Sequence, residues 1–168
     1  MKASSRRVLS EPQAEKIFCS IYKKMLIKFG HNKTTTTSEL NKIGKELFGS
    51  KYLGTFAQDA LPPVIYSKIS KYAIINVDTT GMSGTHWIGI AGLTASPRSF
   101  DQRSLTNGKI MVFDSFGRAS KTLLPLLRQT IDTDSDAEQK QIQLSCGQFS
   151  MAWLVFFDRY GPKNAKLI

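Results

Sequence analysis

Residues 143–157, Gln-Leu-Ser-Cys-Gly-Gln-Phe-Ser-Met-Ala-Trp-Leu-Val-Phe-Phe, decide how this chain folds. Before Cys146, glutamines at 139, 141 and 143 fall on one face and the apolar residues Ile142 and Leu144 on the other, which is the period of a strand. After Cys146 the run is apolar on nearly all sides and contains no proline, as in a helix that is buried all round. The pattern predicts a strand over 140–144 and a buried central helix over 146–160.

Cys146 therefore lies where a strand ends and a buried helix begins. The N-terminus of a helix carries unpaired N–H groups and a partial positive charge. Both features lower the pKa of a thiol and make it more reactive. A free cysteine is also often a small buried apolar residue. This segment alone leaves both interpretations open.

Length and composition indicate one globular domain over residues 1–168. The hydrophobic content of 41% and the charged content of 21% are ordinary for a soluble protein. No run of 18 apolar residues is present, so we expect no contact with a membrane. The two cysteines, Cys19 and Cys146, favour a reducing intracellular compartment over a disulfide framework, and with two widely spaced histidines they predict no metal site. We expect a monomer.

The chain is strongly basic, with 23 lysines and arginines against 13 acidic residues and a net charge of +10. This balance favours a polyanionic partner, and nucleic acid is the first candidate. The basic residues are dispersed along the sequence, which suits sequence-independent contacts with the phosphates of double-stranded DNA better than base readout. A basic surface that binds nothing remains the alternative.

The remaining elements suggest an α+β domain with helices around a central antiparallel or mixed β-sheet. We expect a flexible basic arm over 1–9, a helical part over 10–70, a sheet over 71–145 and the central helix after it. Within the helical part, Ser10 and Thr36 (or Ser38) are candidate N-caps, and residues 51–56 are expected to be irregular. Strands are predicted at 71–77, 86–91 and 109–114, a polar loop at 94–108, and a short helix at 123–131.

Three residues at the ends of predicted elements form a candidate catalytic set. A thiol protease needs a cysteine, a base, a group that orients the base, and donors for the oxyanion. His86 heads one strand, Asp114 ends another, and Cys146 starts the helix. If the strands pair, both side chains reach the same end of the sheet as Cys146. A buried structural histidine and an aspartate that caps its own turn are the alternatives.

The segments around these residues resemble the adenain family, the maturation proteases of adenoviruses. The shared motifs are Gly84-Thr85-His86-Trp87, then Val-Phe-Asp-Ser-Phe-Gly at 112–117, then Gln143 and Ser145-Cys146-Gly147, in that order. Upstream, 38–40, 45–47 and 52–56 also resemble the start of the family, so the similarity covers roughly 38–157. It implies the cysteine-protease fold of the clan that adenain shares with the ubiquitin-like-protein proteases.

The resemblance assigns a role to each matching residue. It implies that Cys146 is the nucleophile, that His86 is the general base, and that Asp114 orients His86, although adenain has glutamate there. Trp87 would pack beside them. Gln143 would donate to the oxyanion with the backbone N–H of Cys146. Its spacing from the cysteine is shorter than in adenain, so Gln141 is the alternative.

The function implied is that of a viral cysteine endopeptidase that cleaves capsid and other virion precursors near glycine. The size of the chain suggests a virophage or polinton-like virus, with the enzyme in the virion and the infected cell. No cofactor is required by the sequence, but the charge is compatible with DNA as an activator. The rivals are a deubiquitinating or ubiquitin-like-protein protease, an acetyltransferase of the same clan, and a non-catalytic basic DNA-binding module.

Overall fold

The computed structural model describes residues 7–31, 33–67, 69–82, 85–93, 108–134, 138 and 144–168. The helices within these ranges are α1 (Glu11–Phe29), α2 (Thr37–Phe48), α3 (Ser120–Leu123) and α4 (Cys146–Ala165). The strands are β1 (Tyr52–Ala57), β2 (Tyr72–Asn76), β3 (Trp87–Gly92), β4 (Ile110–Phe113) and β5 (Thr130–Asp132). Short 3-10 turns occupy Gly49–Lys51, Gln58–Ala60 and Pro63–Tyr66.

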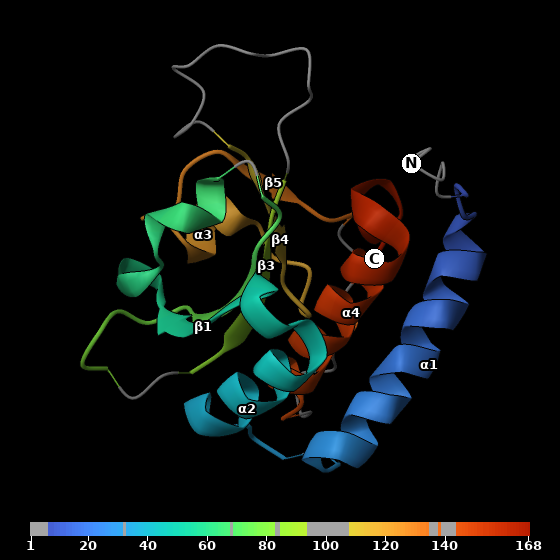
Figure 1. Ribbon diagram of the computed structural model, residues 1–168, viewed down its shortest axis with the longest axis horizontal. Coiled ribbons are helices and arrows are strands. Elements are labelled where there is room, and N and C mark those ends of the chain that lie inside the picture. Colours follow the sequence, from blue (N-terminus) through green and yellow to red (C-terminus); the bar gives the residue numbers. More distant parts are fainter. Residues whose placement is uncertain are drawn as a thin grey trace.

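The strands form one five-stranded mixed sheet in the order β1-β2-β3-β4-β5. The central pairs β2–β3 and β3–β4 are antiparallel, whereas the outer pairs β1–β2 and β4–β5 are parallel. The α+β class with a mixed central sheet is therefore confirmed. In Figure 1 the sheet stands at the centre, with α4 and then α1 on one side of it and α3 on the other.

The helix starts follow the sequence signals. At the start of α1, the Ser10 hydroxyl accepts from the backbone N–H of Gln13 (3.4 Å), and the Gln13 side chain accepts from the N–H of Ser10 (3.1 Å). Thr36 and Glu39 make the same reciprocal pair at the start of α2. Such capping boxes satisfy donors that the first helical turn leaves unpaired. The capping predictions for Ser10 and Thr36 are confirmed.

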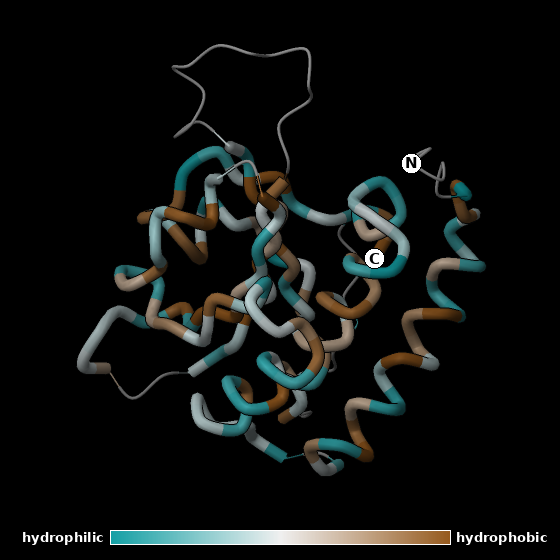
Figure 2. The backbone as a smooth tube through the Cα atoms, in the orientation of Figure 1, coloured by the Kyte–Doolittle hydropathy of each residue, from teal (hydrophilic) through white to brown (hydrophobic). Residues whose placement is uncertain are grey.

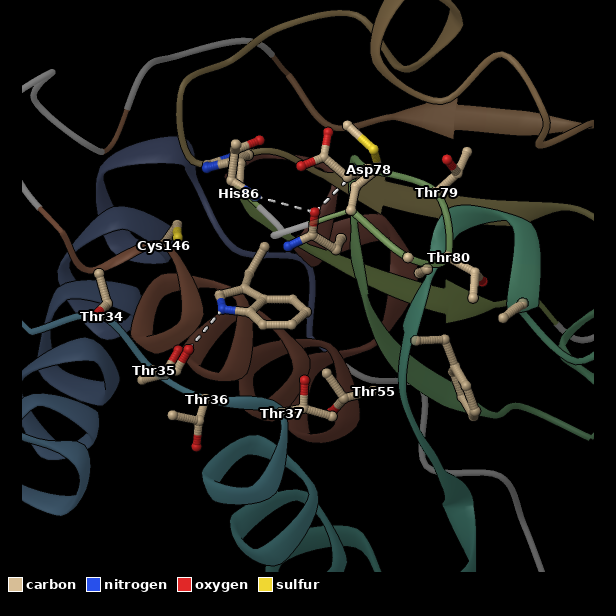
Figure 3. A pocket seen from close by; sticks show the side chains of 18 residues that line it. Thr34, Thr35, Thr36, Thr37, Thr55, Asp78, Thr79, Thr80, His86 and Cys146 are labelled. Atoms are coloured by element: carbon tan, nitrogen blue, oxygen red, sulfur yellow. Dashed lines mark hydrogen bonds between the residues drawn. The ribbon is translucent and has the colours of Figure 1, made fainter.

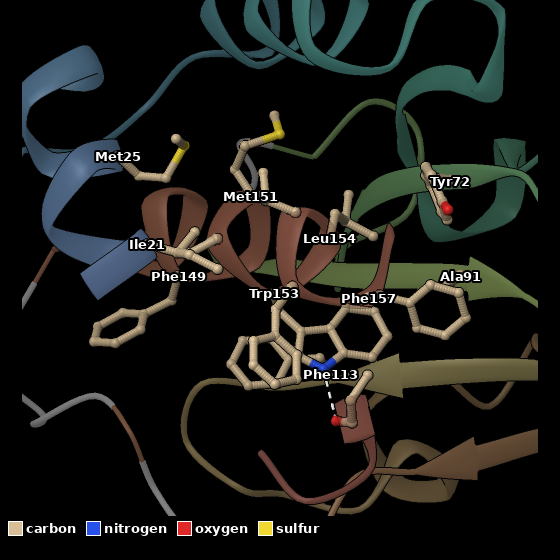
Figure 4. Close-up of a cluster of buried hydrophobic side chains, with 14 of the residues drawn as sticks. Ile21, Met25, Tyr72, Ala91, Phe113, Phe149, Met151, Trp153, Leu154 and Phe157 are labelled. Carbon is tan, nitrogen blue, oxygen red and sulfur yellow. Dashed lines mark hydrogen bonds between the residues drawn. The ribbon is translucent and has the colours of Figure 1, made fainter. Parts of the chain in front are cut away.

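Helix α4 is the centre of the core. It packs against β3 and, on its other side, against α1. The Trp153 ring stacks on Phe113 of β4 at 5.5 Å between centroids, and the Trp153 indole N–H donates to the carbonyl oxygen of Ala165 (3.1 Å). Phe18 of α1 meets the same Phe113 edge-on at 5.9 Å. Figure 4 shows the Phe113 and Trp153 side chains next to each other beside α4. The start of α4 is therefore fixed by close packing along the helix.

Both faces of the sheet are covered by apolar side chains. Alternate strand residues point toward α4, and the others build a second cluster on the opposite face, which includes Ala73, Ile75, Ile88, Ile90 and Val112. The hydropathy colouring in Figure 2 shows the strands largely apolar and α1 alternating between apolar and polar along its length. This alternation is typical of a helix with one buried face.

Residues 51–56 were predicted to be irregular, but 52–56 belong to strand β1, so the expected helical part contains an edge strand. The register of β1 shifts between Tyr52 and Gly54, and Gly54 has a φ of +142°. A glycine at a register shift breaks the alternation by which a strand is recognised. The parallel partner β2 is distant in sequence, so only the tertiary structure supplies the pairing.

The predicted helix at 123–131 is also wrong. Helix α3 ends at Leu123, and residues Thr130–Asp132 form β5 beside β4. Pro125 explains the early end, because proline disfavours helical backbone in the residue before it. At the other end of the chain, α4 continues past residue 160 to Ala165 through a break at Gly161 (φ 80°).

Some predicted segments lie outside the described residues. These are positions 1–6 of the arm, most of the loop at 94–108 and the strand at 140–144 except Leu144. In the described part of the chain, no helix combines the length and the apolar character needed to cross a membrane.

Candidate active site

Cys146 is the first residue of α4, and the helix start around it is unusually arranged. Ser145 occupies the N-cap position, but its side chain makes no capping bond. The first intrahelical bond runs from the N–H of Phe149 to the carbonyl oxygen of Ser145 (2.9 Å). The first turn of α4 therefore keeps backbone N–H groups without a side-chain cap, next to the sulfur.

The loop between α1 and α2 is clamped onto this turn. The fully buried Gln148 side chain donates to the carbonyl oxygens of Gly30 (3.2 Å) and Lys33 (2.8 Å). Gly147 allows the loop to approach, because a Cβ placed there would lie 1.9 Å from the Thr35 hydroxyl oxygen. The position of the cysteine thus depends on close contact with a segment more than a hundred residues earlier in the chain.

His86 and Asp114 meet at one end of the sheet. His86 directly precedes β3 and Asp114 directly follows β4. Because these strands are antiparallel, the two residues lie at the same end of the sheet. The His86 Nε2 atom lies 2.6 Å from the Asp114 Oδ1 atom. Both side chains are buried, with 7% and 2% of their surfaces exposed. Burial strengthens this hydrogen bond and fixes the orientation of the imidazole.

The Asp114 carboxylate has further donors in the turn that follows it. Its Oδ2 atom accepts from the Arg118 Nε (2.8 Å) and backbone N–H (3.0 Å), and Oδ1 accepts from the N–H of Phe116 (3.3 Å). Burial alone would raise the pKa of Asp114, but His86 and Arg118 outweigh it and lower that pKa to about 2. The carboxylate both caps its own turn and binds His86, so the two interpretations of Asp114 describe one arrangement.

The His86 ring and the Cys146 thiol line the same groove and shift each other's pKa. Burial raises the pKa of the Cys146 thiol, but His86 and the backbone amides of Trp87 and Gly147 outweigh burial and lower it. Burial likewise lowers the pKa of His86, but Asp114 and Cys146 outweigh burial and raise it. The two shifts agree: they favour a thiolate beside an imidazolium.

Aromatic side chains lie beside His86 and Cys146. The centroids of the Phe116 and His86 rings lie 5.1 Å apart. The Arg118 guanidinium lies over the same Phe116 ring, 5.1 Å from its centroid. Trp87 packs against the core, and its indole N–H donates to the carbonyl oxygen of Thr35 (3.0 Å). The imidazole is therefore held by a ring contact as well as by hydrogen bonds.

Cys146 and His86 open into a groove of about 670 Å³ (Figure 3). Residues Thr34 to Thr37 line one side of it, and Asp78, Thr79 and Thr80 line the other. Threonine hydroxyls and small or apolar side chains dominate the lining. An extended polypeptide presents backbone donors and acceptors that such hydroxyls can bind. The groove thus gives a ligand access to the sulfur of Cys146.

Of the residues singled out from the sequence, Cys146, His86, Asp114 and Trp87 come together in this one site. Gln143 and Gln141 lie outside the described residues. Sequence reasoning missed Arg118 and the lining role of 34–37, which resembled a short polar linker. A cation four residues after Asp114, just beyond a glycine turn, was the signal available for Arg118.

Other groups that were weighed lie elsewhere. Cys19 is exposed on α1; the partial desolvation that its thiol still experiences raises the thiol pKa, as do the negative charges of Glu138 and Glu15. His31 is exposed beyond the end of α1. Within the ranges described, no cluster of three or more histidine, cysteine, aspartate or glutamate side chains is arranged to hold a metal ion.

Comparison with known proteins gives two significant relatives, while no protein-family model matches the chain. The protease of fowl adenovirus A serotype 1 (strain CELO / Phelps) is 28% identical over 148 residues, which covers 77% of this chain and 66% of that protein. The protease of avian adenovirus 8 (strain ATCC A-2A) is 27% identical over 134 residues, which covers 75% of this chain and 65% of that protein. The chain is thus a distant homologue of adenovirus proteases and matches slightly less than two thirds of their length.

Proposed function

We propose that the chain is a viral cysteine endopeptidase in which the Cys146 thiolate attacks peptide bonds. The observation that carries the proposal is the His86 ring, which binds Asp114 at 2.6 Å, lines the same open groove as the Cys146 thiol and lowers the pKa of that thiol. A buried structural cysteine needs neither a histidine beside it nor a carboxylate bound to that histidine. The homology to adenovirus proteases supports the same chemistry.

In the proposed mechanism, the Cys146 sulfur attacks the carbonyl carbon of the substrate. The developing oxyanion is stabilised by the backbone N–H of Cys146, with Gln143 or else Gln141 as the side-chain donor. The His86 imidazolium gives its proton to the leaving amine, which departs as the sulfur becomes acylated. His86 then takes a proton from water, whose oxygen attacks the thioester and releases the acid. Asp114 holds the ring in the required tautomer throughout.

The substrates proposed are capsid and other virion precursor polypeptides, cut near glycine, as the resemblance to adenain implies. The setting would be the virion and the infected cell of a virophage or polinton-like virus. The deubiquitinating, acetyltransferase and non-catalytic alternatives are not favoured by the two relatives, both of which are called proteases.

We also propose sequence-independent binding of double-stranded DNA, with DNA as a candidate activator. The net charge of +10 supports it. Contacts with phosphates weaken steeply as salt displaces them. Binding to a random-sequence duplex should therefore fall by orders of magnitude between roughly 0.05 and 0.5 M salt. Binding that is unchanged over this range would contradict phosphate contact.

The endopeptidase proposal is tested by co-expressing the chain with the capsid precursors of its own virus. We expect Cys146→Ala to abolish cleavage and Cys19→Ser to preserve it, because Cys146 lines the groove with His86 whereas Cys19 is exposed on α1. A glycine-terminated vinyl-sulfone peptide should label the wild type and fail on Cys146→Ala. Processing that survives Cys146→Ala would contradict the proposal. Labelling by a ubiquitin-derived probe in place of the peptide would indicate the deubiquitinating alternative.

A further inference from the structure

The groove beside Cys146 carries an unusual charge. Of the described residues that line it, Asp78 is the one carboxylate, and no lysine or arginine is among them. The chain as a whole has a net charge of +10, so an acidic lining contrasts with the protein around it. Beside the sulfur, the raised pKa of His86 and the lowered pKa of Cys146 favour opposite charges on the two groups, which add no net charge to the groove.

The Asp78 carboxylate has no ion pair or side-chain hydrogen bond within the part of the chain that the structure describes. Other acids have such partners: Asp114 binds Arg118, Asp158 binds Lys51, and Asp59 accepts from Thr80. The Asp78 residue is also partly buried. A partly buried carboxylate gains from a cation, because burial removes some of its hydration.

Asp78 is held at a fixed position relative to the candidate catalytic residues. The buried Asn76 side-chain oxygen accepts from the backbone N–H of Asp78 (2.9 Å) and from that of Thr85 (3.3 Å), the residue before His86. The carbonyl oxygen of Asp78 accepts from the N–H of Gln58 (3.2 Å). One amide thus connects the backbone of Asp78 to that of the His86 segment. In Figure 3 Asp78 lies on the same side of the groove as Thr79 and Thr80, across from Thr34 to Thr37.

We propose that Asp78 determines specificity by binding a lysine or arginine of the substrate within a few residues of the scissile bond. The substrate class is therefore a basic polypeptide segment next to a small residue. This inference rests on the proposed endopeptidase function. The opposing wall of threonines offers hydroxyls to the backbone and no cation that would compete for the carboxylate. Charge complementarity of this kind selects partners more strongly than it adds affinity.

The test uses peptides with a central glycine in which one flanking position at a time is varied. At each varied position, three peptides carry lysine, glutamine or glutamate. For the wild type we expect kcat/KM at the responsive position to be about fivefold higher with lysine than with glutamine, the effect of a partly exposed ion pair. Glutamate should be worse than glutamine. Asp78→Asn should bring kcat/KM for the lysine and glutamine peptides to within about twofold of each other, and Asp78→Lys should favour glutamate. Asp134→Asn, which changes an exposed acid outside the groove, is the matched control.

Equal kcat/KM for lysine and glutamate peptides at every position, or a lysine preference that survives Asp78→Asn, would overturn the proposal. Binding of the same peptides to Cys146→Ala protein, followed by fluorescence anisotropy, gives a readout that does not require cleavage. Binding that favours lysine through Asp78, without any turnover by the wild type, would support the specificity role and contradict the endopeptidase function. Turnover without any charge preference would support the endopeptidase function and contradict the specificity role of Asp78.

Discussion

Replacing Arg118 with alanine tests how the imidazole of the candidate site is supported. Arg118 contacts neither Cys146 nor His86 in the structure. Its Nε donates to the Asp114 Oδ2 atom at 2.8 Å, and its guanidinium covers the Phe116 ring that packs on His86. The substitution removes both contacts and retains the backbone donation from residue 118 to the same carboxylate (3.0 Å). It should therefore loosen Asp114 without removing its charge.

The expected loss is moderate. A hydrogen bond between charged groups contributes about 1.5–3 kcal/mol when both partners are buried. The Arg118 side chain is 45% exposed, so solvent screening reduces this to about 1 kcal/mol. If the whole effect reaches the transition state, kcat/KM falls roughly fivefold. Arg118→Lys should restore part of it, because a lysine keeps the charge but loses the planar donor geometry.

The pH profile distinguishes a role in positioning from a general loss of stability. Arg118 competes with the His86 imidazolium for the same carboxylate. Without Arg118 the pKa of Asp114 rises from about 2, yet the group stays ionised near neutral pH. The imidazolium is then stabilised further, so the pKa of His86 rises and the alkaline limb of kcat/KM moves to higher pH. Asp114→Asn removes the negative charge and should move the same limb to lower pH.

The assay is hydrolysis of a glycine-containing peptide followed from about pH 5 to 10, a range that spans both expected limbs. Arg128→Ala is the matched control, because Arg128 also lies over an aromatic ring, that of Tyr66 at 5.5 Å, but has no contact with the site. We expect the control to behave as the wild type. An Arg118→Ala enzyme with wild-type kcat/KM and an unmoved alkaline limb would refute the reasoning.

Three further outcomes are expected. Iodoacetamide should alkylate Cys146 much faster than Cys19 at pH 6–7, since His86 lowers the pKa of Cys146 whereas partial desolvation raises that of Cys19. The His86→Ala substitution should remove this difference in rate. Equal rates in the wild type would contradict the thiolate–imidazolium pair. Asp114 has its pKa lowered to about 2 in the folded state, so its stabilising effect is complete above its unfolded pKa near 3.9 and is lost as the pH falls toward 2. Urea titrations should show Asp114→Asn about 2 kcal/mol less stable than the wild type at pH 6 and nearly equal to it at pH 2, and a constant difference would contradict this linkage. Gly147→Ala should lower the free energy of unfolding by about 1–3 kcal/mol because its Cβ would meet the Thr35 hydroxyl, and a Thr35→Ala background should reduce that cost; additive effects in the double-mutant cycle would contradict the contact.

Local sequence signals predicted much of the framework. The capping boxes at Ser10 and Thr36 depend on residues three positions apart, and both are present. The strands around residues 72–76, 87–92 and 110–113 follow from β-branched and aromatic runs. The predictions failed where pairing came from distant partners. Strand β1 carries a glycine at a register shift, and β5 is a three-residue edge strand with no alternation of its own.

The sequence by itself determined which residues form the candidate catalytic set and where each stands in the chain. Cys146 begins an apolar helix, and His86 and Asp114 bound apolar strands, because residue type and periodicity are local properties. Only the tertiary structure decided that the three residues meet. That contact depends on the antiparallel pairing of β3 with β4 and on the packing of α4 against the sheet. The tertiary structure likewise revealed the ion pair between Arg118 and Asp114, and the Asp78 carboxylate that has no such partner among the described residues. Ion pairs depend on positions in space, which the order of residues along the chain does not show.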